Sequence, residues 1–207
     1  MIMKRYLTVP VIALILLPIW LTPGSAAGGV PTDQIKSTVE KALVVLKDPR
    51  LKPASKTKER REQLKQILFA RFDFSEMAKR ALGANWRRRT PKEQDEFVRL
   101  FSDLLERAYA DTIESYSDEK IVYVGERLDG GYADISSKVL TSKGEEFSLN
   151  YRAHFVGSEW RVYDVVVENI SMVNNYRSQF NRVITNASYE ELVRRLRDKA
   201  DFPMQKN

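Results

Sequence analysis

Residues 72–116 read FDFSEMAKRALGANWRRRTPKEQDEFVRLFSDLLERAYADTIESY. The second half of this stretch predicts a long helix, because Thr90, Pro91 and Glu93 supply a hydroxyl N-cap, a proline in the first turn and an acid that closes a capping box. Apolar residues then recur every three or four positions over Phe97–Ile113, which makes one broad apolar stripe. Such a helix is about 40 Å long. Its aromatic side needs a large apolar partner, and we expect that partner to be the face of a sheet.

The first half of the stretch predicts a shorter helix over Phe72–Leu82, with Gly83 as its C-cap. Trp86 and three adjacent arginines, Arg87–Arg89, lie between the two helices. Three neighbouring arginines are consistent with phosphate binding. The sequence favours the simpler interpretation, a solvated turn between two helices.

The N-terminal segment is typical of a secretory signal peptide. Lys4 and Arg5 precede an apolar run over Leu7–Leu21, and small residues follow at the expected cleavage site. This run is too short and too interrupted by proline for a comfortable membrane span, and an uncleaved membrane anchor is the alternative. We therefore expect a signal peptide over residues 1–27 and a single domain over residues 28–207.

The 207-residue chain is mildly basic and contains no cysteine. Its formal charge is +6, which falls to +4 when the two basic residues of the signal peptide are removed. This charge suits an anionic membrane surface or an acidic partner, and export argues against nucleic acid. The lack of cysteine excludes disulfides, a thiol nucleophile, a thiolate metal site and a lipoprotein anchor.

Helical periodicity recurs on both sides of the central stretch. Residues Thr32–Lys47 and Thr57–Ala70 predict two helices joined by a basic loop. The charged residues at 58–62 are most simply a solvated helix face. A last helical region begins near Ser171 and continues into a helix over Ser188–Lys199.

Beyond residue 116 the hydrophobic pattern changes from helical to alternating. The runs that predict strands are Ile121–Val124, Tyr132–Thr141, Phe147–Val156 and Trp160–Glu168. Sequential hairpins give a four-stranded antiparallel meander, and helices before and after it indicate the α+β class with helices packed on one face. The large inward residues either fill a solid core or enclose an apolar cavity, and periodicity does not distinguish these two arrangements.

Few residues have catalytic potential. The single histidine, His154, lies on the polar side of its strand, and no serine lies in a nucleophile elbow. Tyr163 and Asp164 form an ionisable pair inside a valine-rich strand, and a buried carboxylate can act as a general base. Small cone-shaped α+β domains host isomerases with such a pair. The interpretation that the sequence favours is structural: Asp164 hydrogen-bonds a helix end or a loop backbone.

Two segments carry a family pattern. The first contains Ala81, Leu82, Gly83, Trp86, Thr90, Pro91, Glu93, Phe97, Phe101 and Tyr109, and the second contains Trp160, Val162, Tyr163, Asp164, Val167, Glu168, Ile170 and Ser171. In order and spacing they resemble the MlaC family of periplasmic phospholipid-binding proteins, also called the toluene-tolerance family, over nearly the whole mature chain. Asn169 stands where the family usually has glycine. Because asparagine also tolerates positive φ, we expect the turn to survive.

The resemblance implies a periplasmic shuttle with a cone-shaped, NTF2-like α+β fold. Members of this family hold the acyl chains of a phospholipid in a deep apolar cavity between sheet and helices, with the head group near solvent. They carry lipid between an outer-membrane lipoprotein complex and an inner-membrane ABC transporter that has an MCE subunit. The resemblance implies no catalytic residue, no metal, no cofactor and no ATP site on this chain, and we expect a monomer.

We expect the cavity to be lined by apolar and tyrosine side chains from the helices and the inner face of the sheet. They are Phe74, Met77, Phe97, Phe101, Leu104, Leu105, Tyr109, Ile135, Val139, Phe147, Leu149, Tyr151, Val162, Val165, Met172 and Tyr176.

Two basic clusters are candidate docking surfaces for anionic head groups or acidic partners. One is Arg87–Arg89, and the other comprises Arg194, Arg195, Arg197 and Lys199. Three alternatives to the phospholipid shuttle remain open. They are a hopanoid or other isoprenoid lipid as ligand, a small isomerase or hydratase that uses Asp164 and Tyr163, and an interaction module with a solid core.

Overall fold

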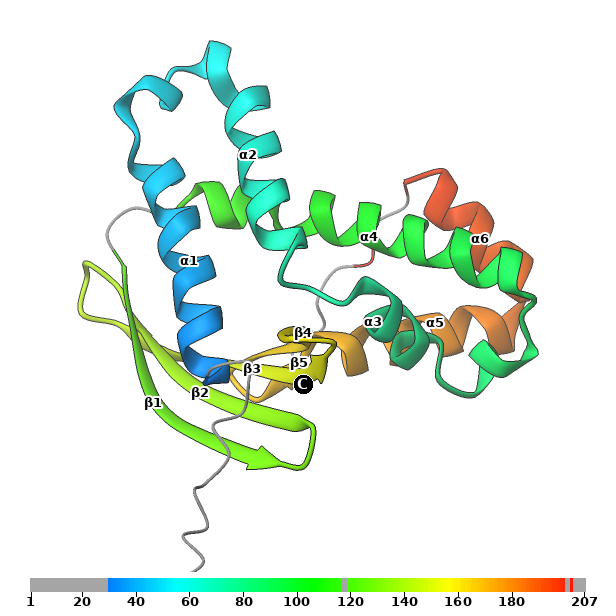
Figure 1. The fold of residues 1–207 in the computed structure, drawn as a ribbon. Coiled ribbons are helices and arrows are strands. Elements are labelled where there is room, and N and C mark those ends of the chain that lie inside the picture. Colours follow the sequence, from blue (N-terminus) through cyan, green and yellow to red (C-terminus); the bar gives the residue numbers. More distant parts are fainter. Residues whose placement is uncertain (1–29, 117–118, 200–201, 203–207) are drawn as a thin grey trace, which may run out of the picture.

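The computed structural model of the chain describes residues 30–116, 119–199 and 202, and the expected signal peptide lies outside these residues. Helices occupy both ends of the described chain and an antiparallel sheet lies between them, as the sequence predicts (Figure 1). Within the described residues, no helix combines the length and the apolar character that a membrane span requires.

The helices lie close to the predicted spans. They are α1 (Pro31–Lys47), α2 (Thr57–Phe69), α3 (Phe74–Leu82), α4 (Pro91–Glu114), α5 (Met172–Asn186) and α6 (Tyr189–Arg197), with short 3-10 turns η1 (Pro49–Leu51), η2 (Ala54–Lys56) and η3 (Gly83–Arg88). The α4 capping box between Thr90 and Glu93 is confirmed. Helix α3 starts later than predicted because Asp73 is its N-cap and Phe72 instead pairs with Val162 of the sheet.

The sheet has five strands, not the predicted four. They are β1 (Lys120–Asp129), β2 (Tyr132–Leu140), β3 (Glu146–Val156), β4 (Glu159–Val167) and β5 (Ile170–Ser171), arranged in that order with antiparallel neighbours. The short β5 folds back on β4 through a turn in which Glu168 and Asn169 have φ of 48° and 64°. Asparagine therefore occupies the left-handed conformation that we expected it to tolerate.

Strand β1 is longer than the predicted Ile121–Val124. Its register against β2 shifts between Tyr123 and Gly125, and pairing then continues to Asp129. Such a bulge breaks the apolar–polar alternation, and this is why the sequence pattern ended the strand too early.

The aromatic stripe of α4 packs on other helices, and the expectation that the sheet is its main partner is wrong. Phe97 meets Phe180 of α5 and Tyr189 of α6, with ring centroids 5.6 and 6.4 Å apart. Phe101 meets Tyr176 and Phe180 of α5 at 5.3 and 5.6 Å. The N-terminal half of α4 therefore belongs to a helical layer with α5 and α6.

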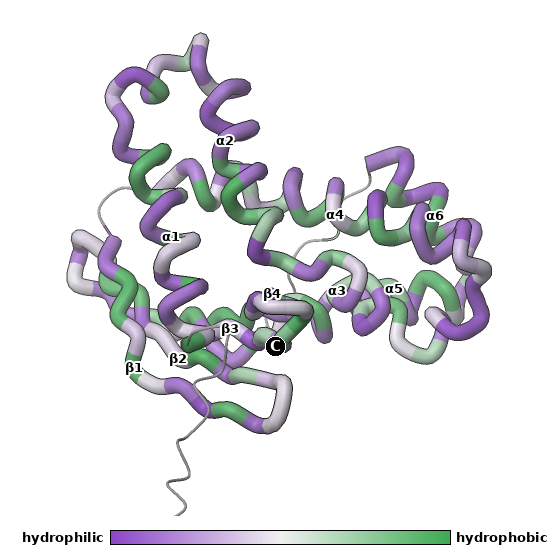
Figure 2. The backbone as a smooth tube through the Cα atoms, viewed as in Figure 1, coloured by the Kyte–Doolittle hydropathy of each residue, from purple (hydrophilic) through white to green (hydrophobic). Residues whose placement is uncertain are grey.

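The described chain contains two separate hydrophobic clusters. The main cluster joins the sheet to α3, α4, α5 and α6, and Ile35 from the first half of α1 also belongs to it. The small cluster holds Ala42, Val45, Leu51 and Leu64, at the far end of α1 and in α2. In Figure 1 the α1–α2 hairpin projects away from the sheet, and Figure 2 shows that α2 is largely hydrophilic. The hairpin thus has a core of its own.

Candidate functional site

The strand register determines which predicted residues share the inner face of the sheet. Ile135 on β2 lies opposite Tyr151 on β3, and Tyr151 lies opposite Val165 on β4. Val139 faces Phe147 in a second row across β2 and β3. The inner face is therefore a continuous surface of branched and aromatic side chains.

Most of the residues predicted to line a cavity lie in the main cluster. The buried ones are Met77, Phe97, Phe101, Leu104, Leu105, Ile135, Tyr151, Val162, Val165, Met172 and Tyr176, and the half-buried ones packed against them are Phe74, Tyr109 and Leu149. Val139 is buried and Phe147 half-buried, but both lie outside this cluster. The structure thus brings together nearly all of the predicted residues, which come from helices α3, α4 and α5 and from strands β2, β3 and β4.

One end of this cluster is closed by direct packing of aromatic rings. Phe97 and Phe101 stack 6.0 Å apart, and Tyr176 and Phe180 lie 5.6 Å apart. All four side chains are fully buried. Between α4 and α5 the interior is consequently a solid aromatic core.

The other end carries tyrosine hydroxyls. Tyr109 lies in the second half of α4, and Tyr123 lies on β1 opposite Ser137 of β2. Both hydroxyls are enclosed and neither makes a hydrogen bond of good geometry within the described chain, although the Tyr176 hydroxyl lies close to that of Tyr109. Burial raises the pKa of Tyr109, and it raises the pKa of Tyr123 to about 12, with a smaller contribution from the charge of Glu40. Both side chains are therefore neutral hydrogen-bond donors in the physiological range.

Tyr123 is absent from the residues predicted to line the cavity. Its strand was predicted, but Ile121–Val124 is apolar at every position, so the sequence does not separate inward from outward residues there. In the structure Ile121 and Tyr123 are half-buried while Val122 and Val124 are exposed. Only the structure therefore identifies Tyr123 as an inward residue of β1.

Asp164 has a structural role. Its carboxylate accepts hydrogen bonds from the Val173 backbone at 3.0 Å, from the Ser171 hydroxyl at 2.6 Å and from the Arg152 guanidinium at 3.1 Å. These bonds join the start of α5 to the sheet. The favoured interpretation, that Asp164 binds a helix end, is confirmed.

The ring of Tyr163 is also in contact with neighbouring side chains. The Arg80 guanidinium lies over its ring, 4.0 Å from the centroid, and the ring of His154 meets it edge-on. His154 Nε2 lies 3.0 Å from a carboxylate oxygen of Asp73. Burial raises the pKa of Tyr163, so this hydroxyl is a weaker acid than in water. The pair offers no free general base of the kind that an isomerase needs.

The two basic clusters differ in how much of their charge is compensated. Arg194 and Arg195 share Glu191 at 2.8 and 2.7 Å, Arg194 also binds Asp198, and Arg197 binds Glu96. Hydrogen bonds from Arg194 and Arg195 lower the pKa of Glu191 to about 2. Most of the α6 charge is therefore neutralised locally, which leaves little for a docking surface.

The cluster at Arg87–Arg89 retains more free charge. Arg89 lies 3.5 Å from Glu93 and over the ring of Tyr189, whereas Arg87 and Arg88 are exposed and make no ion pair with any other described residue. They remain candidates for docking. In the described ranges no group of three His, Asp or Glu side chains is arranged to hold a metal ion.

Two hollows indent the surface of the described chain. One, of about 430 Å³, lies on the C-terminal half of α1 and is lined mainly by Leu43, Val44 and Pro49. The other, of about 230 Å³, is polar and includes Arg152 and Asn169. Of the predicted lining residues, only Ile135 and Tyr151 border either hollow.

Comparisons with known proteins agree on one family. A family model described as "MlaC protein" matches residues 36–198. The chain is 23% identical over 130 residues to the "Intermembrane phospholipid transport system binding protein MlaC" of Haemophilus influenzae, a match that spans 60% of this chain and 61% of that protein. It is 25% identical over 158 residues to the "Toluene tolerance protein ttg2D" of Pseudomonas putida, which spans 75% of this chain and 74% of that protein.

A solved structure has the same fold. The phospholipid-binding protein from Ralstonia solanacearum, determined in complex with a phospholipid, superposes with a TM-score of 0.73 at 26% sequence identity. The superposition covers 83% of this chain and 97% of that one.

Proposed function

Since the chain belongs to the MlaC family, we propose that it is a periplasmic carrier of phospholipid. One observation carries the proposal. The chain shares its fold, at a TM-score of 0.73 and over 97% of the other chain, with a phospholipid-binding protein that was solved with a phospholipid bound. The same fold assembles most of the predicted inward residues into one cluster between sheet and helices.

The carrier works between two membranes. Residues 1–27 export it to the periplasm, an outer-membrane lipoprotein complex supplies or receives the lipid, and an inner-membrane MCE/ABC transporter is the other partner. The H. influenzae relative is named as the binding protein of an intermembrane phospholipid transport system, which supports this assignment of partners. The carrier itself performs no chemical reaction. The hydrogen bonds that occupy Asp164 support this view.

The energetics of such a carrier are set by the acyl chains. Burial of one methylene group is worth about 0.8 kcal/mol, so exposing two chains of roughly 30 methylenes to water would cost more than about 20 kcal/mol. A carrier must therefore offer an interior about as apolar as the membrane, so that transfer between the two is nearly neutral. The branched and aromatic inner face of β2, β3 and β4 meets this requirement.

The half-buried members of the cluster are the best placed to contact acyl chains first. Leu149 lies on β3 opposite Val167, and Tyr109 lies on the second half of α4. Both pack against the main cluster without being fully covered. The interlocked rings of Phe97, Phe101 and Phe180 then form the closed floor of the binding region.

Native mass spectrometry of the mature chain purified from the periplasm tests this function. We expect a heterogeneous mass increment that solvent extraction resolves into two-chain phospholipids. A triterpenoid increment would instead select the hopanoid alternative. A single lipid-free mass, with no lipid in the extract, would contradict the carrier function and favour an interaction module with a solid core.

Bulky substitutions locate the binding region in the same experiment. Leu104→Trp fills space within the main cluster and Leu149→Trp fills space at its edge, and we expect each to reduce the co-purified lipid by about half or more. Leu128→Trp is the matched control, because Leu128 is 55% exposed on β1. Near-ultraviolet circular dichroism checks that each variant is folded. Unchanged lipid content in both folded variants would refute this location.

A further inference from the structure

Four tyrosines lie in two neighbouring pairs within the proposed binding region. Tyr123 on β1 lies opposite Ser137, and Tyr151 on β3 lies opposite Ile135, so both project from the inner face across β2. Tyr109 on α4 and Tyr176 on α5 form the other pair. Within each pair the two side chains are close enough for one to influence the pKa of the other.

The hydroxyls of Tyr109 and Tyr123 are unusual among buried polar groups. Buried tyrosine hydroxyls nearly always have a hydrogen-bond partner. These two are enclosed and meet no partner at hydrogen-bond geometry in the part of the chain that the structure describes. Phenylalanine would bury the same ring without this penalty. A role for the hydroxyls in contact with the cargo gives a physical reason for tyrosine at both positions.

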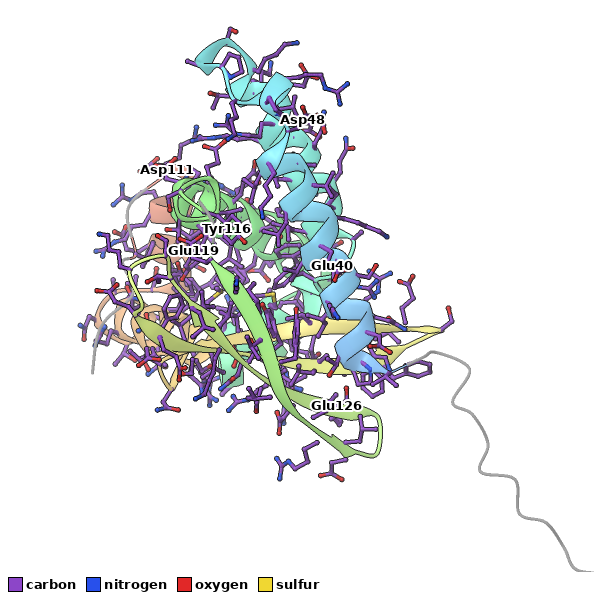
Figure 3. All side chains as sticks on the ribbon, turned by 90° about the vertical axis from the view of Figure 1, so that its left-hand side faces the viewer. Glu40, Asp48, Asp111, Tyr116, Glu119 and Glu126 are labelled. Atoms are coloured by element: carbon purple, nitrogen blue, oxygen red, sulfur yellow. The ribbon has the colours of Figure 1, made fainter. Side chains whose placement is uncertain are left out.

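The surroundings determine which group of a lipid these hydroxyls suit. Glu40 on α1 is the charged group that influences Tyr123, and its side chain is 62% exposed and lies 4.0 Å from Lys36. Figure 3 shows Glu40 on α1, where this helix passes β1. A phosphate prefers cationic partners, and neither hydroxyl has a cationic side chain at hydrogen-bond distance in the described chain. A neutral carbonyl oxygen needs no cationic partner and accepts a hydrogen bond from a neutral phenol.

We propose that the hydroxyls of Tyr109 and Tyr123 donate hydrogen bonds to the ester carbonyl oxygens that join the acyl chains to glycerol. This inference rests on the proposed carrier function and makes it more specific. The ester bonds are the polar groups at the inner end of the lipid head, next to the acyl chains. The two tyrosines thereby fix how far the chains enter the interior, and the carrier prefers ester-linked to ether-linked lipids, because an ether has no carbonyl oxygen.

The test compares two lipids that differ only in this linkage. The lipid-stripped mature chain is loaded from vesicles that contain equimolar diacyl phosphatidylglycerol and its dialkyl ether analogue, and the bound lipids are quantified by mass spectrometry. We expect the wild-type chain to hold about tenfold to a hundredfold more ester lipid, because each of the two neutral hydrogen bonds contributes about threefold to tenfold. Tyr109→Phe and Tyr123→Phe should each lower this ratio, and the double variant should bring it close to one.

The matched control is Tyr132→Phe, because Tyr132 is 49% exposed and its ring lies against His154 and Tyr163 at the surface. This variant should keep the wild-type ratio. Thermal unfolding of the lipid-stripped chain provides a second measurement. The substitutions that lower the lipid ratio should not lower the melting temperature. Removing an unpaired buried hydroxyl should leave the melting temperature of Tyr109→Phe and Tyr123→Phe unchanged or raise it by about 2 °C.

The outcomes separate the two proposals. Equal binding of ester and ether lipid by the wild-type chain would overturn the role of the hydroxyls and leave the carrier function intact. A wild-type preference that persists in the double variant would also overturn it. If the chain takes up neither lipid, the carrier function itself fails, and the role of the hydroxyls fails with it.

Discussion

Among single residues, Asp164 connects the sheet to α5 through its buried carboxylate. It is 3% exposed and receives hydrogen bonds from a backbone N–H, a hydroxyl and a guanidinium. A carboxylate that accepts several hydrogen bonds in the interior is held in one geometry. Its position before α5 therefore fixes the direction in which the chain leaves the sheet.

We expect Asp164→Asn to lower the free energy of unfolding by about 1–3 kcal/mol, because the amide keeps one acceptor and turns an N–H group towards other donors. Urea denaturation at neutral pH measures this change. Asp134→Asn is the control, since Asp134 is 43% exposed and its ion pair with Arg127 should contribute less than about 1 kcal/mol. Equal effects of the two substitutions would contradict the role assigned to Asp164.

Among the elements, α2 packs on α1 through the small cluster and is joined to α4 by ion pairs. Lys65 binds Glu106 at 2.8 Å, and both Arg60 and Arg61 bind Glu114, at 3.0 and 2.8 Å. Glu114 is only 11% exposed, so solvent screens it less than most surface carboxylates. Hydrogen bonds from Arg61 and then Arg60 lower the pKa of Glu114.

Glu114→Gln should reduce the free energy of unfolding by about 1–2 kcal/mol at neutral pH, because it leaves two arginines without their shared carboxylate. The folded pKa of Glu114 lies below its ordinary value of 4.5. The stabilisation is therefore complete above that ordinary value and is lost as pH falls through the folded pKa. Urea titrations at several pH values should show wild type and variant converging in acid.

The control for this experiment is Glu146→Gln. Glu146 pairs with Lys138 at 2.6 Å, but both side chains are about half exposed, at 47% and 49%. We expect its loss to change stability by less than about 1 kcal/mol. A difference between wild type and Glu114→Gln that does not depend on pH would show that the charge of Glu114 contributes nothing.

The sequence predicted these elements better than it predicted their partners. The apolar stripe of α4 showed that the helix packs on something, but the stripe carries no information on whether that partner is a sheet or another helix. The charges at 58–62 were interpreted as a solvated face because Glu114, the partner of Arg60 and Arg61, is more than 50 positions away. Strand β5 has two residues and is too short to show a period.

For the candidate site, too, the sequence predicted the residues better than it predicted their packing. Asp164 was recognised because one carboxylate among valines is conspicuous, and the favoured structural role proved correct. The cavity residues were predicted from alternation and helical spacing, which identify the inward side of each element. Those patterns contain no information on how tightly the inward side chains pack, so the solid ring cluster around Phe97 could not be told from a cavity wall.

At the scale of the whole molecule, the two hydrophobic clusters predict unequal stability. The main cluster holds large aromatic residues from several elements, whereas the small cluster has four buried residues, and Leu64 is the only buried residue of α2. Local opening is least costly where few apolar contacts break. The α1–α2 hairpin is therefore the part of the described chain that opens most readily.

Hydrogen–deuterium exchange measures this difference directly. We expect amides in α2 to exchange about 10–100 times faster than those in α5, because α2 contributes no residue to the main cluster and its opening leaves that cluster intact. Salt should widen the gap, since the Debye length shortens to about 3 Å at 1 M and the ion pairs to α4 weaken. The α5 amides are the internal control, as Tyr176 and Phe180 anchor them in the main cluster and salt should leave their exchange unchanged. Equal protection of α2 and α5 at both salt concentrations would show that α2 opens only with the whole fold.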